Sequence, residues 1–371
     1  MGPVDPAATP PPDVVNCHEL EALARERLTP QAFAYVAGGS GDEHTLAWNV
    51  EAWSRIRLAP RFLVDVSSID TTLRLLGHDL ASPVVLAPTA SHRLFHPDGE
   101  LETVRGAAAA EALYVQSTLA TVAVGEVGAA ATGPWWFQVY IQRDRGFTAE
   151  LVARAEDAGA SALVLTVDLP VLGARDTDRR NSLGLPVGVE YANLRGLELV
   201  PDDLPPARRV YNPHLDPTVT WRDVDWLSSV ARVPVVLKGV LRADDARRCL
   251  DHDVAAVVVS NHGARNLDTV PATVEALPGV VAAVDGRLPV LVDGGIRRGT
   301  DVAKALILGA TAVLIGRPYV WGLAVHGAAG VKLVVDMLRT ELEMAMGLLG
   351  APTLADLGPD LLWDASGEPL R

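Results

Sequence analysis

The segment Ser260 to Asp268 places a titratable side chain and a cation close together after an apolar run. His262 can exchange a proton near neutral pH, and Arg265 offers a fixed fork of donors that suits a carboxylate. Residues 254–259 are all valine or alanine, which is typical of a buried strand. The spacing therefore indicates proton-transfer chemistry on a small acid at the end of a strand.

Three further charged residues follow apolar runs elsewhere. Asp168 follows the run that ends near Thr166, and a carboxylate there could hydrogen-bond His262, fix its tautomer and stabilise its protonated form. Arg175, in the next loop, is a second candidate for holding a carboxylate, with an ordinary surface arginine as the alternative. Lys238 ends another run and, if buried, needs an anionic or electron-rich partner such as a flavin ring; a lysine whose head reaches solvent is the alternative.

Two glycine-arginine motifs are candidates for a phosphate site. They are Asp293–Gly299 and Gly316-Arg317, and each follows an apolar run. Backbone N–H groups left open by glycine, together with an arginine, can surround a phosphate. Tight turns are the alternative reading of a single glycine pair, but two such motifs after neighbouring strands favour phosphate binding.

Eight short runs rich in Val, Ile and Leu alternate with stretches of helical character. Continuous apolar runs suit strands that are covered on both faces, and eight βα repeats close into a barrel whose carboxyl-end rim carries the active site. We therefore predict an α/β fold, a TIM (β/α)8 barrel, with an open doubly wound sheet as the alternative. The predicted strands are 84–87, 113–116, 136–140, 162–166, 235–238, 256–260, 290–293 and 312–316.

The other segments are arranged around this barrel. Helices are expected at 17–27, 29–37 and 328–349, and the long Pro-rich loop after the fourth strand is predicted to be a lid or an interaction loop. The predicted segments are a disordered leader at 1–16, a helical segment packed on the barrel at 17–82, the barrel at 83–350 with its loop at 181–217, and a tail at 351–371.

Composition narrows the possible partners. The chain has 32 Lys and Arg against 46 Asp and Glu, a net charge of -14, which works against binding nucleic acid or an anionic membrane. Cys17 and Cys249 lack metal-ligand spacing, so neither a metal site nor a disulfide framework is expected. With no signal peptide and no apolar run near the ~20 residues that cross a bilayer, we predict a cytoplasmic protein.

These residues together resemble the FMN-dependent α-hydroxy acid oxidases and dehydrogenases, a family that includes glycolate oxidase, lactate oxidase and mandelate dehydrogenase. The resemblance runs from about Cys17 to the terminal helix, with Ser260–Asp268 as its most specific element. The supporting motifs are Asp-Gly-Gly-Ile-Arg-Arg-Gly-Thr at 293–300, Leu-Lys-Gly-Val at 237–240 and Gly-Asp-Glu-His-Thr-Leu at 41–46.

The resemblance implies an FMN cofactor, and a small 2-hydroxy acid and O2 as partners. His262 would take a proton with support from Asp168, while Arg175 and Arg265 would hold the substrate carboxylate. Tyr35 and Tyr140 would bind substrate oxygens, and Lys238 would stabilise the reduced flavin. The residues implied to line FMN are Ala87, Pro88, Thr89, Ala90, Ser117, Gln138, Thr166, Ser260, Asp293 and Gly294, and those at its phosphate are Gly295, Arg297, Gly316 and Arg317.

One departure bears on the substrate. Glycolate oxidase has a tryptophan at the position of Leu119, and leucine leaves more room, so burying a phenyl ring there could contribute roughly 1.5–3 kcal/mol. The resemblance thus implies oxidation of (S)-mandelate or 4-hydroxymandelate to the 2-oxo acid, with O2 reduced to H2O2, by a homotetramer. The alternatives are a lactate- or glycolate-type oxidase, a dehydrogenase with another electron acceptor, and an FMN-dependent isomerase.

Overall fold

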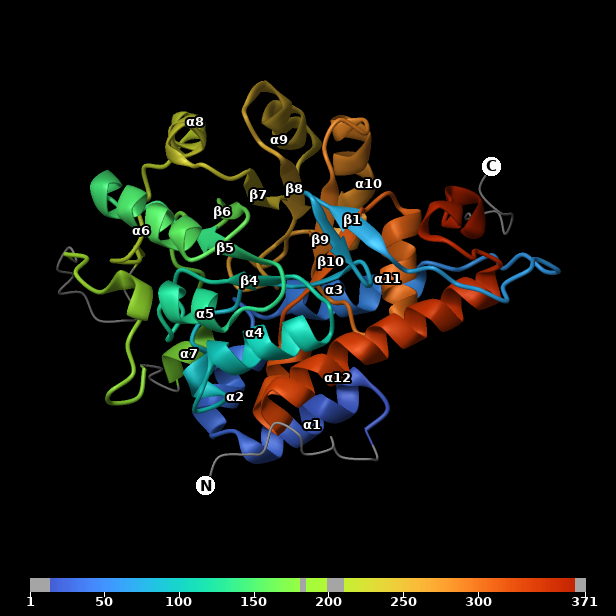
Figure 1. Ribbon diagram of the computed structural model, residues 1–371, viewed down its shortest axis with the longest axis horizontal. Coiled ribbons are helices and arrows are strands. Elements are labelled where there is room, and N and C mark those ends of the chain that lie inside the picture. The colour runs from blue at the N-terminus through green and yellow to red at the C-terminus, as the bar shows by residue number, and fades with distance from the viewer. Residues whose placement is uncertain (1–13, 181–184, 199–209, 364–371) are drawn as a thin grey trace.

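Eight parallel strands close into a barrel in this computed structural model, which describes residues 14–180, 185–198 and 210–363. Neighbours along the chain pair with one another, and β10 pairs back to β3 (Figure 1). Each strand overlaps one predicted run, so the predicted TIM barrel is confirmed. The strands are β3 (Val84–Leu86), β4 (Tyr114–Gln116), β5 (Trp135–Val139), β6 (Leu163–Thr166), β7 (Val235–Val240), β8 (Ala256–Val259), β9 (Val290–Asp293) and β10 (Ala312–Ile315).

Helices follow the barrel strands and cover them from outside (Figure 1). Their apolar side chains and the outward-facing strand residues form one buried cluster, as expected for a sheet covered by helices. The covering helices are α4 (Glu100–Ala109), α5 (Val124–Ala130), α6 (Arg145–Asp157), α8 (Trp221–Val230), α9 (Ala243–Arg248), α10 (Thr273–Val284), α11 (Gly299–Ile307) and α12 (Arg317–Leu349).

The segment before the barrel contains the two predicted helices, α1 (Cys17–Arg27) and α2 (Pro30–Ala37). Asn16 and Thr29 cap them through their side chains, which explains why the helices begin there. The segment expected to be helical, 17–82, is helical only as far as Arg55. Besides a third helix, α3 (His44–Arg55), it holds an antiparallel hairpin of β1 (Leu73–Leu75) and β2 (His78–Leu80).

The hairpin closes the amino-terminal end of the barrel. Leu75 and Leu80 are buried in one apolar cluster with Val85, Trp136 and Leu314, which project into the barrel interior. Strands of three residues give little periodic signal, which is why the sequence pattern did not reveal them. With this end filled by side chains, an active site can form only at the opposite, carboxyl-terminal rim.

α12 consists of two helical parts that meet at His326 and Gly327, and Gly327 has a φ of +58°. The second part corresponds to the predicted terminal helix at 328–349. By length and a mean hydropathy of 1.3, α12 is the one helix within the described ranges that could cross a membrane, and 56% of that apolar window is buried. It packs against α1, α4 and α11 (Figure 1).

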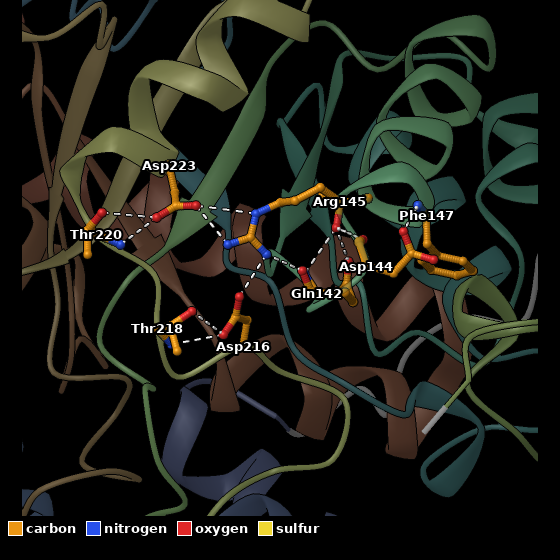
Figure 2. Close-up of polar contacts among 9 residues, drawn as sticks. Gln142, Asp144, Arg145, Phe147, Asp216, Thr218, Thr220 and Asp223 are labelled. Atoms are coloured by element: carbon orange, nitrogen blue, oxygen red, sulfur yellow. Dashed lines mark hydrogen bonds and ion pairs between the residues drawn. The ribbon is translucent and has the colours of Figure 1, made fainter. Parts of the chain in front are cut away.

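The predicted loop at 181–217 is described in part, because residues 181–184 and 199–209 lie outside the described ranges, as do leader residues 1–13 and tail residues 364–371. Its carboxyl end is fastened by Arg145 at the start of α6 (Figure 2). The Arg145 guanidinium lies 2.8 Å from Asp216 and 2.7 Å from Asp223, in the first turn of α8. These ion pairs fix where the loop returns to the barrel.

Candidate active site

A cavity of about 550 Å³ opens at the carboxyl-terminal rim of the barrel. Every residue of the predicted site lines it except Asp168 and Ser260. The cavity therefore collects side chains from the ends of all eight strands, from α2, and from the loop after β6. Strand-end residues meet in this way because parallel barrel strands all point to the same rim.

The residues that could transfer a proton are paired. His262 Nδ1 lies 2.7 Å from Asp168 Oδ1, so the carboxylate fixes the imidazole tautomer. His262 and the two residues after it, Gly263 and Ala264, have φ values of +59°, +61° and +62°. Left-handed backbone at histidine and alanine is strained, and it is held here by bonds such as His262 N–H to Ser260 Oγ at 3.1 Å.

Asp168 is ionised in this pair. Burial raises the pKa of its carboxyl group, but the charge and hydrogen bond of His262, together with the charge of Lys238, hold that pKa below its ordinary value. Its second oxygen, Oδ2, is buried and has no hydrogen-bond partner among the residues described. Asp168 therefore contacts His262 and does not itself line the cavity.

Lys238 has a carboxylate partner within the protein. Its ammonium lies 2.7 Å from Asp293 Oδ2 and 2.7 Å from Ser260 Oγ, and its side chain is 5% exposed. The anionic partner that a buried lysine needs is therefore present within the protein, as Asp293, and a bound ligand could be a second one. Ser260 is not among the residues that line the cavity, and its hydroxyl is held between Lys238 and Asp293, which do line it.

The two candidate carboxylate-binding arginines, Arg175 and Arg265, both line the cavity. Arg265 Nη1 donates to the carbonyl oxygens of Tyr35 at 2.6 Å and Gly38 at 3.0 Å, and its guanidinium lies 4.6 Å from the centre of the Tyr35 ring. Burial, and then the nearby charge of Arg175, lower the pKa of Arg265. Two neighbouring cations favour the binding of an anion that contacts both.

The predicted phosphate end is strongly positive. Arg317 donates to the carbonyl oxygens of Val36 and Gly38, both at 2.8 Å, and Arg297 stacks on Trp321 at 4.9 Å. Burial is the main cause that lowers the pKa of both arginines, and for Arg317 the charges of Arg265 and Arg297 lower it further. Neither Arg297 nor Arg317 has an ion pair in the part of the chain that the structure describes.

Glycines at this end let the loop after β9 pack closely on α3 and leave a helix start beside the arginines. Gly295 has a φ of +80°, and a Cβ there would lie 1.7 Å from the carbonyl oxygen of Asn49, so only glycine fits. Gly316 stands at the start of α12, whose first N–H groups are available to an anion. A cluster of buried arginines beside a helix start is the environment that a phosphate dianion needs.

Gln138 supplies an unpaired donor on the cavity wall. Its Oε1 accepts from Ser117 Oγ and from Thr118 N–H, both at 3.2 Å, which turns Nε2 the other way. Nε2 is buried and lacks a hydrogen-bond partner within the described ranges. A buried donor without a partner is costly, so this amide fits a ligand that carries a carbonyl oxygen.

Several cavity residues were missed from the sequence. Asp178 stands three residues after Arg175 in α7 (Asp176–Arg180), a spacing that brings helical side chains together and could have revealed it. Tyr191 and Asn212 belong to the loop predicted as a lid, and both line the cavity. Leu169 and Leu172 also line it, and no local pattern distinguishes them from core residues.

Metal chemistry has no candidate ligand set in the described residues. No group of three or more His, Cys, Asp or Glu side chains there is arranged to hold a metal ion. Cys17 and Cys249 are buried free thiols. Burial raises the pKa of Cys17 to about 12 and that of Cys249 to about 11, so both remain protonated at neutral pH.

Comparison with known protein families identifies the family of this chain. The sequence model of the FMN-dependent dehydrogenases matches residues 24–364. The chain belongs to the FMN-dependent dehydrogenase family. It is 48% identical to an L-lactate oxidase of Nostoc, over 94% of this chain and 98% of that one. It is 46% identical to a peroxisomal (S)-2-hydroxy-acid oxidase of rice, over 92% and 94% of the two chains. A structure of mandelate oxidase with (S)-2-phenylpropionate matches with a TM-score of 0.85 and 42% identity, over 93% and 97%.

FMN is the cofactor of this FMN-dependent dehydrogenase, and the cavity residues fit it. When bound, FMN supplies the acceptor for the two electrons that leave the substrate. The unpaired Nε2 of Gln138 would donate to a ring carbonyl, and the buried guanidinium groups of Arg297 and Arg317 would hold the phosphate. The Lys238–Asp293 pair would lie beside the ring system.

Proposed function

We propose that this FMN enzyme oxidises an (S)-2-hydroxy acid with a bulky aryl side chain, (S)-mandelate or 4-hydroxymandelate, to the 2-oxo acid. O2 would be the final electron acceptor and H2O2 its product. Relatives named as 2-hydroxy-acid and lactate oxidases support the reaction class, and structures named as mandelate oxidase support the aryl substrate.

The observation that carries the aryl substrate is the apolar wall of the cavity. Leu119 packs against Tyr140, Leu169 and Leu215, which form a buried cluster of their own, and all but Leu215 line the cavity. Burying a phenyl ring against such a wall contributes roughly 1.5–3 kcal/mol. Glycolate has no side chain that could pack against this apolar wall.

The charged residues would bind the carboxylate of this substrate and accept its proton. Arg175 and Arg265 would hold the carboxylate, and His262 Nε2 would receive the proton that the substrate loses. With Nδ1 bonded to Asp168, Nε2 is the nitrogen left for this task. Burial raises the pKa of Tyr140, so its neutral phenol can donate a hydrogen bond to a substrate oxygen.

A lactate- or glycolate-type oxidase is the second candidate, favoured by the name of the Nostoc relative, an L-lactate oxidase. An FMN-dependent isomerase would not need two carboxylate-binding arginines beside a histidine, so their presence in one cavity argues against it. A dehydrogenase with another acceptor would share this site, and its flavin would stay reduced in air. Cytoplasmic location and a homotetramer remain predictions.

The Leu119→Trp variant tests the aryl assignment. We expect the wild-type flavin to be reduced faster by (S)-mandelate and (S)-4-hydroxymandelate than by (S)-lactate or glycolate under anaerobic conditions. Tryptophan fills the space beside the substrate, so kcat/KM for the aryl acids should fall about tenfold or more while glycolate changes little. Equal losses for aryl and short acids would overturn the pocket argument.

A further inference from the structure

Asp178 touches both arginines of the candidate carboxylate site. Its Oδ2 lies 3.4 Å from Arg175 Nη1 and 3.4 Å from Arg265 Nη2. All three side chains line the active-site cavity, and each is less than one-fifth exposed. No other carboxylate in the described residues forms an ion pair with either arginine.

Asp178 is not what holds Arg265 in position. Two carbonyl oxygens hold the Arg265 guanidinium at 2.6 and 3.0 Å, whereas the contact to Asp178 is longer and uses a single carboxylate oxygen. A strong anchor for arginine would be short and bidentate. What Asp178 mainly supplies is a negative charge next to two cations.

We propose that Asp178 is the resident counter-ion of the carboxylate site and limits how tightly that site holds anions. It reduces the charge of the arginine pair from two positive to one. A guanidinium has five N–H donors, so both arginines keep donors for a ligand while Asp178 stays in contact. This inference rests on the proposed role of Arg175 and Arg265 in binding the substrate carboxylate.

The consequence concerns turnover. The 2-hydroxy acid and the 2-oxo acid both carry a carboxylate. Without Asp178, the two arginines would therefore bind both substrate and product more tightly. Uniform binding of this kind lowers KM without speeding chemistry, and it slows the release of product. Asp178 therefore keeps the carboxylate site weak enough to release the 2-oxo acid.

Benzoate binding to the FMN-loaded protein tests the proposal, since benzoate is a monocarboxylate with no hydroxyl to oxidise. Asp178→Asn removes the charge and keeps a hydrogen-bond acceptor. By equilibrium dialysis at low salt, we expect this variant to bind benzoate about tenfold more tightly than wild type and the neutral analogue benzamide within twofold of it. Product inhibition by phenylglyoxylate should strengthen in parallel.

Asp157→Asn is the control. Asp157 ends α6, is 70% exposed and pairs with Arg232 at 2.7 Å, and neither residue lines the cavity, so the variant loses the same charge away from the site. Its benzoate affinity should stay within twofold of wild type. Benzoate binding by Asp178→Asn that is unchanged or weaker would overturn the proposal, because an anchor for the arginines would give weaker binding.

Two further variants keep the test decisive if Asp178→Asn does not fold. Asp178→Ser also removes the charge, so it should tighten benzoate binding, and Asp178→Glu keeps the charge and should stay within threefold of wild type. Tighter binding by the Glu variant would contradict a charge effect. Wild-type protein that binds no benzoate would instead count against the proposed carboxylate site itself.

Discussion

His262 Nδ1 lies 2.7 Å from Asp168 Oδ1, and this pair links the ends of two barrel strands, β6 and β8. The carboxylate stands behind the imidazole, and the imidazole lines the cavity. His262 thus faces the cavity, while Asp168 sets the tautomer of its imidazole.

Replacing Asp168 by asparagine should slow flavin reduction while FMN stays bound. The amide cannot stabilise a protonated imidazole, and it permits the wrong tautomer, so we expect the rate to fall about 10²- to 10⁴-fold. Anaerobic stopped-flow absorbance with (S)-mandelate measures this rate. Asp225→Asn is the control, because it breaks a similar 2.6 Å contact to His252 on the surface. A rate within twofold of wild type for Asp168→Asn would remove this aspartate from the mechanism.

The lowered pKa of Asp168 makes a prediction about stability and pH. The carboxyl group has a lower pKa in the folded protein than its ordinary value of 3.8, so the unfolded chain binds more protons near that pH. Its stabilisation is present in full above the unfolded pKa and is lost as pH falls through the folded pKa. We would measure the free energy of unfolding in urea at pH 7, 5 and 3.5. Wild type should lose stability relative to Asp168→Asn only at the lowest pH. A difference that is constant with pH would contradict the assignment.

Arg317 should contribute strongly to FMN affinity. Its guanidinium is buried beside Arg297 and Arg265, and a charge-assisted bond to phosphate is worth about 1.5–3 kcal/mol. Arg317→Met should therefore weaken FMN binding by roughly 10- to 100-fold, measured by quenching of FMN fluorescence on addition of flavin-free protein. Arg298→Met is the control, since Arg298 is half exposed and pairs with Glu341. Equal effects of the two substitutions would argue against a phosphate site here.

The Arg145 ion pairs should affect substrate binding from outside the cavity (Figure 2). They fix Asp216, next to Leu215 of the apolar cluster and four residues after Asn212 of the cavity wall. Arg145→Met should raise KM for (S)-mandelate about three- to tenfold, with a smaller change in kcat, as the wall loosens. Arg232→Met, which breaks the ion pairs of an exposed arginine at the other end of α6, should leave KM unchanged. A KM equal to that of wild type in Arg145→Met would show that the loop holds its place without this arginine.

The barrel and most cavity residues could be predicted because parallel strands leave a simple sequence signal. Each buried strand reads as an apolar run, and the polar residue at its end lies on the rim, as Lys238, His262 and Asp293 do. Contacts between distant segments leave no such signal. The pairing of Lys238 with Asp293 depends on how β7 and β9 flank β8, and local spacing cannot show it.

We expect His262 to take the substrate's proton while FMN receives its electrons. The decisive measurement is anaerobic addition of (S)-mandelate to the FMN-loaded protein, with wild type and His262→Gln compared. The wild-type flavin spectrum should bleach and return with H2O2 in air, while His262→Gln should keep its yellow flavin and stay oxidised. Bleaching of His262→Gln at the wild-type rate would contradict the role of the histidine, and a wild-type flavin that (S)-mandelate does not reduce would contradict the proposed substrate.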